Sequence, residues 1–182
     1  MHDAQIVQLA RLHERHPGLT EALGQSYVEA AYVCLARHHL PPAIFAINQD
    51  GNQFTAVIDF SVPDARTVNA HANEIDATEI GAYGISLAAI ETVAGMVAVR
   101  RAETRTGADW YIAPEGELLE DLESCVRLEV SGINAGSSND VKRRLHEKIA
   151  QATRGDSNLP AIAAVVGFKV LEVAISPLGV RA

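Results

Sequence analysis

The succession of hydrophobic patterns between residues 74 and 168 restricts the fold more than any other feature of this sequence. A helical period is followed by three short segments rich in strand-forming residues, a second helical period and one continuous apolar run. Such a run is typical of a strand that is buried on both faces. The pattern predicts helix, strand, strand, strand, helix and strand over 74–94, 96–102, 108–113, 125–131, a helix from Ser137 or Ser138 to about 153, and 161–168.

The flanking residues predict an extension at each end of this core. Pro17-Gly18 separates two expected helices, over 4–13 and 20–38, and Asp50-Gly51 is the turn signal of a β-hairpin within 43–60. The fold class expected is α+β, in a single domain that covers the whole chain. Its parts are N-terminal helices and hairpin with a polar connector at 61–73 (together 1–73), an α/β-type core (74–168) and a C-terminal tail (169–182).

Length and composition set the broad class. A chain of 182 residues is long enough for one well-buried domain. No apolar run approaches the roughly 20 residues of a membrane span, and no basic segment followed by an apolar stretch opens the chain, so we expect a cytoplasmic protein. Cys34 and Cys125 are not arranged as Cys-x-x-Cys, and two small buried thiols are expected rather than a disulfide or zinc ligands.

Charge is unevenly distributed along the sequence. The net charge of −8 argues against broad, non-specific nucleic-acid binding, which normally requires a basic face. Basic residues nevertheless gather at two places, and a local basic groove stays compatible with the sequence. These two segments contain Arg100, Arg101 and Arg105, and Lys142, Arg143 and Arg144, while acidic residues gather at 115–123.

Three acidic residues lie where the predicted elements would bring them together. Asp109 and Glu129 each occupy the polar side of a short apolar strand. Glu79 lies close to the apolar stripe of helix 74–94, which includes Ile75 and Ala82. Carboxylates that converge are costly to ionise together without a cation, so the three predict a divalent-metal site. The alternatives are that both strand acids face solvent, and that Glu79 bends toward water and meets an arginine.

The helix that begins at Ser137 or Ser138 adds polar side chains to this constellation. Arg144, Lys148 and Gln151 form a contiguous stripe beside the apolar face of the helix. Such a stripe can direct donors at a phosphate group next to a metal ion. The alternative is an ordinary solvated helix edge.

The order of elements, with an acid on each of the second and third strands, resembles the PD-(D/E)xK nuclease superfamily over residues 74–168. The resemblance implies a restriction-endonuclease-like core in which Asp109, in Thr-Gly-Ala-Asp-Trp-Tyr-Ile, and Glu129, in Arg-Leu-Glu-Val-Ser-Gly-Ile, bind Mg²⁺ or Mn²⁺. It further implies that Glu79 completes the metal cluster and that Gln151 is the recurrent polar residue of the following helix. The same strings are also similar to a group of uncharacterised bacterial proteins.

The sequence departs from the superfamily at one position. A lysine is expected two residues after the third-strand acid, and this chain has Ser131. Relocation of that lysine is known in the superfamily, and here Lys142 or Lys148 is available on the next helix. The expected function is a Mg²⁺-dependent phosphodiesterase acting on DNA or RNA, with Asp109, Glu129 and Lys148 as its catalytic residues, and with Arg144 and Gln151 at the substrate phosphate.

Other functional classes stay open at this stage. One is a catalytically inactive relative that keeps the fold as a binding or assembly module, for which the small-residue helix 74–94 offers a surface for a homodimer. Another is a small adaptor or chaperone-like protein, favoured only by acidity and size. In the nuclease-like interpretation, residues 1–73 are expected to be an extension that shapes or covers the site.

Overall fold

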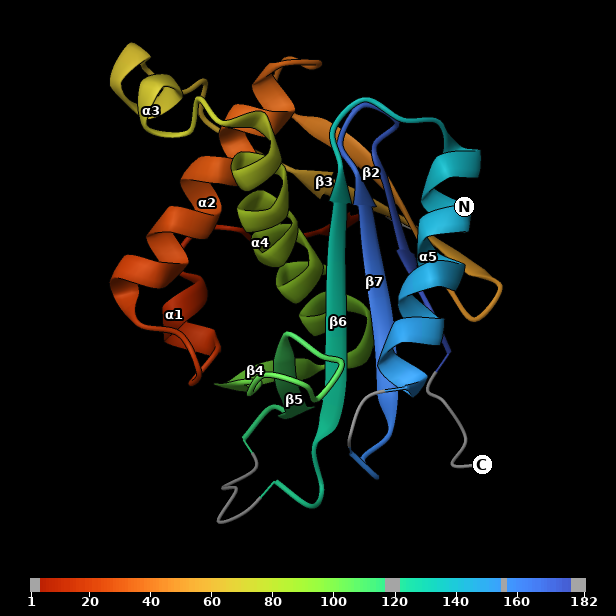
Figure 1. Cartoon of the computed structure of the whole chain (residues 1–182). Coiled ribbons are helices and arrows are strands. Elements are labelled where there is room, and N and C mark those ends of the chain that lie inside the picture. The colour runs from red at the N-terminus through yellow and green to blue at the C-terminus, as the bar shows by residue number, and fades with distance from the viewer. Residues whose placement is uncertain (1–3, 117–121, 155–156, 178–182) are drawn as a thin grey trace.

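The computed structural model describes residues 4–116, 122–154 and 157–177. Within these residues, eight strands form one mixed sheet in the order β1-β3-β2-β8-β7-β6-β5-β4. Helices α2 (Glu21–Ala36) and α4 (Glu74–Ala94) lie on one face of the sheet, and α5 (Ser138–Thr153) lies on the other (Figure 1). The protein is therefore a mixed α and β fold with three layers.

The second half of the chain contains the predicted succession of elements. After α4 come β4 (Met96–Arg101), β5 (Trp110–Pro114) and β6 (Val126–Ile133), then α5 and β7 (Ala161–Gly167). Strands β4, β5 and β6 form an antiparallel meander, whereas β6 and β7 are parallel. Parallel neighbours cannot be joined by a tight turn, so α5 crosses the sheet between them.

The N-terminal part agrees with the sequence only at some elements. The hairpin of β2 (Ala43–Gln49) and β3 (Asn52–Ile58) is confirmed, and both residues of its Asp50-Gly51 turn have positive φ. The helix expected over 4–13 is wrong: β1 (Gln5–Ile6) pairs with β3, and only α1 (Leu12–Arg15) is helical. A short helix, α3 (Ala65–Ala70), interrupts the expected connector.

The expected C-terminal tail is also wrong in part. Residues 172–175 form β8 (Glu172–Ile175), which lies between β7 and β2 and is buried along its whole length. Glu172 accepts a hydrogen bond from Asn48 Nδ2 at 3.0 Å, so a carboxylate is accommodated within the strand. Because a charged residue is not expected in a buried strand, Glu172 made this strand difficult to predict from the sequence. Because β8 joins the hairpin to β7, the two halves of the chain share one continuous sheet.

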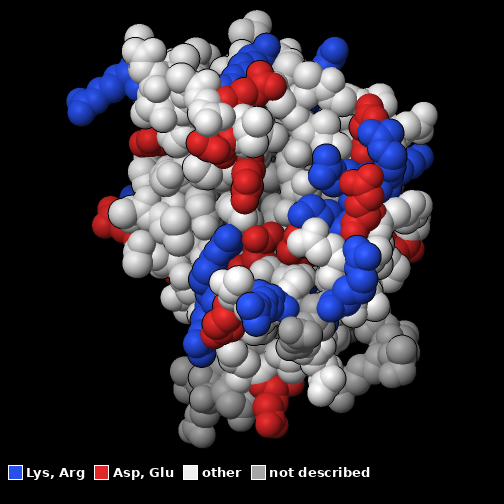
Figure 2. All heavy atoms as spheres, viewed as in Figure 1, with Lys and Arg blue, Asp and Glu red and all other residues white. Residues whose placement is uncertain are grey.

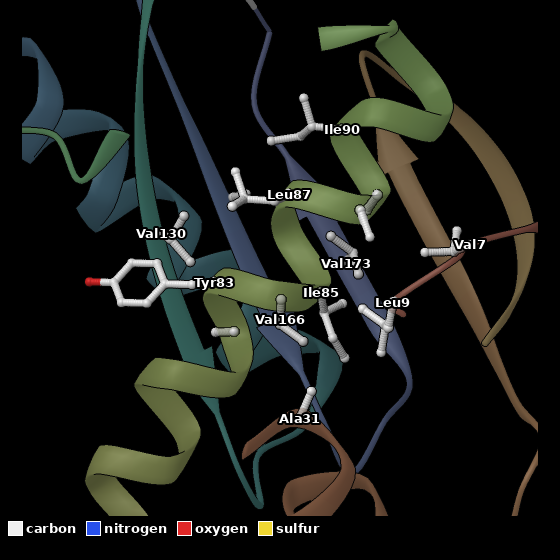
Figure 3. Close-up of a cluster of buried hydrophobic side chains, with 14 of the residues drawn as sticks. Val7, Leu9, Ala31, Tyr83, Ile85, Leu87, Ile90, Val130, Val166 and Val173 are labelled. Carbon is white, nitrogen blue, oxygen red and sulfur yellow. The ribbon is translucent and has the colours of Figure 1, made fainter. Parts of the chain in front are cut away.

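The core lies between the sheet and the pair α2 and α4. Ile85, Leu87 and Ile90 of α4 approach Val166 of β7 and Val173 of β8 (Figure 3). The middle of α4 is buried on all sides because α2 covers the side away from the sheet. Glycine is required where the two helices cross, since a Cβ on Gly81 would lie 2.9 Å from the Ala31 nitrogen.

The edge strand β4 contains a β-bulge that is braced by the N-terminal segment. The register with β5 shifts between Ala98 and Arg100, so Val99 is the extra residue. His16 Nδ1 accepts the Ala98 N–H at 2.9 Å, and Gly18 N–H donates to the Ala98 carbonyl at 2.9 Å. Gly18 fits closely, because a Cβ there would be 2.7 Å from the Val99 carbonyl carbon. Both backbone polar groups of Ala98 are thus bonded to the segment before α2.

The two cysteines and the apolar segments were also expected to have particular roles in the fold. Cys34 and Cys125 are both buried, as predicted. Burial raises the pKa of the Cys34 thiol to about 11, so this thiol stays protonated at neutral pH. In the part of the chain that is described, no helix has the length and apolar character needed to cross a membrane.

Candidate active site

A cleft of about 870 Å³ opens over β6, between the first turns of α4, the β4–β5 connection and α5. Figure 2 shows acidic side chains near the middle of this face, with basic side chains on either side. All six residues predicted from the sequence line the cleft, together with Ser131, Arg101 and Arg105. The six are Glu79, Asp109, Glu129, Arg144, Lys148 and Gln151.

Glu129 lies at the floor of the cleft, on the face of β6 that α5 covers. It is only 4% exposed, so the alternative of a solvent-facing strand acid is wrong for this residue. Its Oε1 accepts hydrogen bonds from Lys148 Nζ at 2.7 Å and from Gln151 Nε2 at 2.8 Å. Burial raises the pKa of Glu129; the bond from Lys148 opposes this rise, and the negative charge of Asp109 adds to it.

The phase of α5 explains why its polar stripe reaches the cleft. Ser137 caps the helix in a reciprocal capping box with Asp140, which fixes where the helix begins. Lys148 and Gln151 are one turn apart, and both reach Glu129. Arg144 lines the cleft one turn earlier, 3.5 Å from Glu147, whereas Lys142 lines a different cavity.

Asp109 immediately precedes β5, and its carboxylate is held from three directions. Oδ2 accepts the Val130 N–H at 2.8 Å, and Oδ1 accepts the Tyr83 hydroxyl at 2.9 Å. Arg101 Nη2 lies 3.4 Å from the same Oδ1. Burial raises the pKa of Tyr83 well above its ordinary value, so its hydroxyl stays protonated and can donate to Asp109.

Glu79 differs from its predicted position. The sequence places it close to the packing face of α4, but Glu79 is exposed, and Ile75 of the same expected stripe is 77% exposed. The first turn of α4 is exposed, and although Ala77 and Thr78 are buried, the continuous run of buried residues starts only at Gly81. Glu79 still lines the cleft, where its Oε1 lies 3.2 Å from the Tyr83 hydroxyl.

Two residues of the cleft region were not singled out from the sequence. Tyr83 bonds Asp109 and follows Glu79 by one helical turn, a spacing that could have identified it. The guanidinium of Arg101 lies 4.6 Å from the Tyr83 ring centroid and 5.2 Å from that of Trp110. Arg101 was visible only as part of a basic segment, because the bulge at Val99 changes which side chains face the cleft.

The donor set suits a hard divalent cation through two carboxylates rather than three. Among the described residues, no group of three or more His, Cys, Asp or Glu side chains is arranged to hold a metal ion. Mg²⁺ commonly uses only one or two protein carboxylates, with water and substrate phosphate oxygens completing the shell. Asp109 and Glu129 can supply such oxygens, and the negative charge of Asp109 contributes to the raised pKa of Glu129. Carboxylate oxygens of this kind are ligands that Mg²⁺ or Mn²⁺ accepts, and the described residues hold no arrangement of three such side chains that would include Glu79.

Glu129→Gln is expected to make the metal-free protein more stable near pH 8. The pKa of Glu129 is raised above its ordinary value of 4.5, so the folded state holds this proton more tightly than the unfolded state. The resulting stabilisation is complete below pH 4.5 and is lost as the pH rises through the raised pKa. Glutamine removes that loss, so the gain in Tm measured in EDTA should shrink toward zero as the pH falls.

Glu147→Gln, at an exposed position of α5, is the matched control and should give no comparable pH-dependent gain. A Glu129→Gln protein less stable than wild type at every pH would contradict the expectation. That result would mean that the Lys148 ion pair outweighs the cost of burying the charge.

Comparisons with known proteins do not assign this chain to a family. No protein-family model matches it. No curated protein and no solved structure gives a match either. Function is therefore inferred from the chemistry of the cleft.

Proposed function

We propose that this chain is a Mg²⁺-dependent phosphodiesterase that cleaves DNA or RNA in the cleft over β6. The observation that carries the proposal is the position of Lys148, whose Nζ lies 2.7 Å from Glu129 in the cleft that Asp109 also lines. Ser131 cannot supply the positive charge that the superfamily places two residues after the third-strand acid. Lys148 brings a charge to the same carboxylate from α5, as a relocated lysine would.

The arrangement of elements supports a restriction-endonuclease-like core over residues 74–168. Helix α4, the β4–β5–β6 meander, the α5 crossover and the parallel strand β7 follow one another as that fold requires. Asp109 immediately precedes the second of these strands, and Glu129 is in the third. In this interpretation, the N-terminal strands and β8 extend the sheet beyond β7.

Each residue has a role that follows from its contacts. Asp109 and Glu129 would hold Mg²⁺ or Mn²⁺, which would lower the pKa of a bound water and neutralise charge on a phosphate oxygen. Gln151 and Lys148 orient the Glu129 carboxylate through Oε1. The Lys148 ammonium, at the carboxylate, is placed to polarise the attacking water, and Arg144 is placed to contact the phosphate.

The basic side chains of the cleft make an acidic protein compatible with a nucleic-acid substrate. Arg101, Arg105, Arg144 and Lys148 all line the cleft, although the whole chain carries a net charge of −8. Neutralisation of phosphates by such residues releases counterions and gives binding that weakens with salt. We therefore expect local, salt-sensitive binding at the cleft.

The test is a cleavage assay with labelled single-stranded and double-stranded DNA and RNA in Mg²⁺, Mn²⁺ or EDTA. Wild-type protein should cleave at least one substrate only when a divalent cation is present. Asp109→Asn should lower that rate by about 10²-fold or more, because it removes a charge that binds the cation. Asp76→Asn, on an exposed turn of α4, is the control and should cleave normally. Cleavage in EDTA, or by Asp109→Asn at the wild-type rate, would contradict the proposal.

A second candidate is a binding module without cleavage activity, favoured by Ser131 and by the exposed position of Glu79. It predicts that wild-type protein binds an oligonucleotide in a salt-dependent manner and leaves it intact in every metal tested. Fluorescence anisotropy with a labelled strand, followed by electrophoresis of the same sample, separates the two candidates.

A further inference from the structure

We propose that Arg101 is a resident counter-ion of Asp109, which a divalent cation must displace in order to bind. This inference rests on the proposed function, because it concerns the same carboxylate. In the metal-free protein, the positive charge of the Arg101 guanidinium offsets the negative charge of the Asp109 carboxylate. A cation that binds Asp109 therefore takes the place of the Arg101 guanidinium.

The contacts of Arg101 place it at the oxygen that the cation needs. Its Nη2 lies 3.4 Å from Asp109 Oδ1 and 3.0 Å from the Tyr83 hydroxyl, which itself donates to that oxygen. Oδ2 is already bonded to the Val130 N–H, a backbone group fixed within β6. Oδ1 is therefore the oxygen that only side chains contact, and of its two partners Arg101 is the one that carries a charge.

Arg101 is held more loosely than the other cation of the site. Lys148 lies 2.7 Å from Glu129, and its side chain is 19% exposed. Arg101 lies 3.4 Å from Asp109, and its side chain is 48% exposed, so its ion pair is the weaker of the two. The incoming cation should therefore displace Arg101, while Lys148 stays at Glu129.

The β-bulge of β4 decides that Arg101, rather than Arg100, reaches this position. Ala98 pairs with Ile112, and Arg101, three residues later, pairs with Trp110. Ile112 and Trp110 both belong to the core beneath α4, so Ala98 and Arg101 share that face although their spacing is odd. If Val99 paired regularly with Tyr111 and formed no bulge, Arg100 would stand opposite Trp110 in place of Arg101.

Trp110 provides a reporter of the exchange that does not depend on catalysis. It is the only tryptophan of the sequence, it is fully buried, and its ring centroid lies 5.2 Å from the Arg101 guanidinium. A cation over the indole face interacts with the ring electrons, so its departure should change the emission. Mg²⁺ is suited to this measurement because it does not itself quench fluorescence.

The experiment measures Mn²⁺ affinity by calorimetry and Trp110 emission during Mg²⁺ titration, both without nucleic acid. Arg101→Gln should bind Mn²⁺ roughly two- to fivefold more tightly than wild type, the range expected from loss of an exposed ion pair. Arg101→Lys, which keeps the charge, should stay close to wild type. The emission change that Mg²⁺ causes in wild type should be absent in Arg101→Gln.

Arg105→Gln is the matched control for general electrostatics. Arg105 lines the same cleft, and within the described residues it has no ion pair with a site carboxylate. Equal gains in Mn²⁺ affinity for Arg105→Gln and Arg101→Gln would overturn the inference, as would an unchanged affinity for Arg101→Gln. In either of these two outcomes, Mn²⁺ binding that is lost in Asp109→Asn would still support the metal site of the proposed function. Absence of binding in wild type and in Arg101→Gln alike would overturn the metal site together with the inference.

Discussion

Lys148→Met should lower metal-dependent cleavage by a factor of about 10²–10⁴, the usual contribution of a group that assists proton transfer. Methionine preserves most of the length and apolar volume of the side chain, and it removes the ammonium 2.7 Å from Glu129. Binding of the oligonucleotide should change much less than the rate. The measurement is a single-turnover cleavage time course with protein in excess.

Lys142→Met is the control for this prediction, because Lys142 lies on the same helix but lines another cavity. It should cleave at close to the wild-type rate. If Lys148→Met cleaves as fast as Lys142→Met, Lys148 has no role in the reaction. A Tm measured for each variant separates loss of chemistry from loss of fold.

Gly81→Ala should destabilise the protein by about 1–3 kcal/mol, the cost of overpacking a close helix contact. For a chain of this size, that corresponds to a fall in Tm of roughly 2–12 °C. At an exposed helical position, the same change would stabilise the helix by roughly 1 kcal/mol. Here the new methyl group would lie 2.9–3.0 Å from the backbone of Ala30 and Ala31, so α2 and α4 must move apart.

Gly84→Ala provides the comparison one turn along the same helix. Its Cβ would meet Tyr27 at 3.2–3.3 Å, a contact that a small shift can relieve. The two variants share the same gain in helix propensity, so the difference in Tm isolates the effect of the approach at Gly81. A Gly81→Ala protein at least as stable as Gly84→Ala would show that the helix pair is not closely packed there.

Local signals explain why the bounds of some elements could be predicted. The helix expected over 74–94 is found as Glu74–Ala94, since Asn73 caps its first turn and Gly95 ends it with a positive φ. By contrast, β1 pairs with β3 and β8 pairs with β2 as well as with its neighbour β7, so each depends on a strand far away in the sequence, and nothing local identifies a two-residue or four-residue strand. Long-range pairing overrode the local pattern at residues 4–13.

The candidate site was predictable where a residue's direction follows from regular geometry. Alternation along β6 and the phase of α5 place Glu129, Lys148 and Gln151 together, and the structure brings all three into contact. The burial of Glu129 could not be foreseen, because the position of α5 over that face of the sheet is a tertiary property. Arg101 could not be assigned to the cleft because a bulge breaks the alternation on which such predictions depend.

The bonds between Ala98 and the segment around His16 and Gly18 also bear on self-association. Strand β4 forms one border of the sheet, and an unpaired border is a template for strands of other molecules. At Ala98 this border is already occupied by the chain's own backbone and imidazole. The opposite border, β1, is only two residues long. Growth of the sheet from one molecule to the next is thus hindered at Ala98 of β4, and at the opposite border β1 offers only a two-residue strand for pairing.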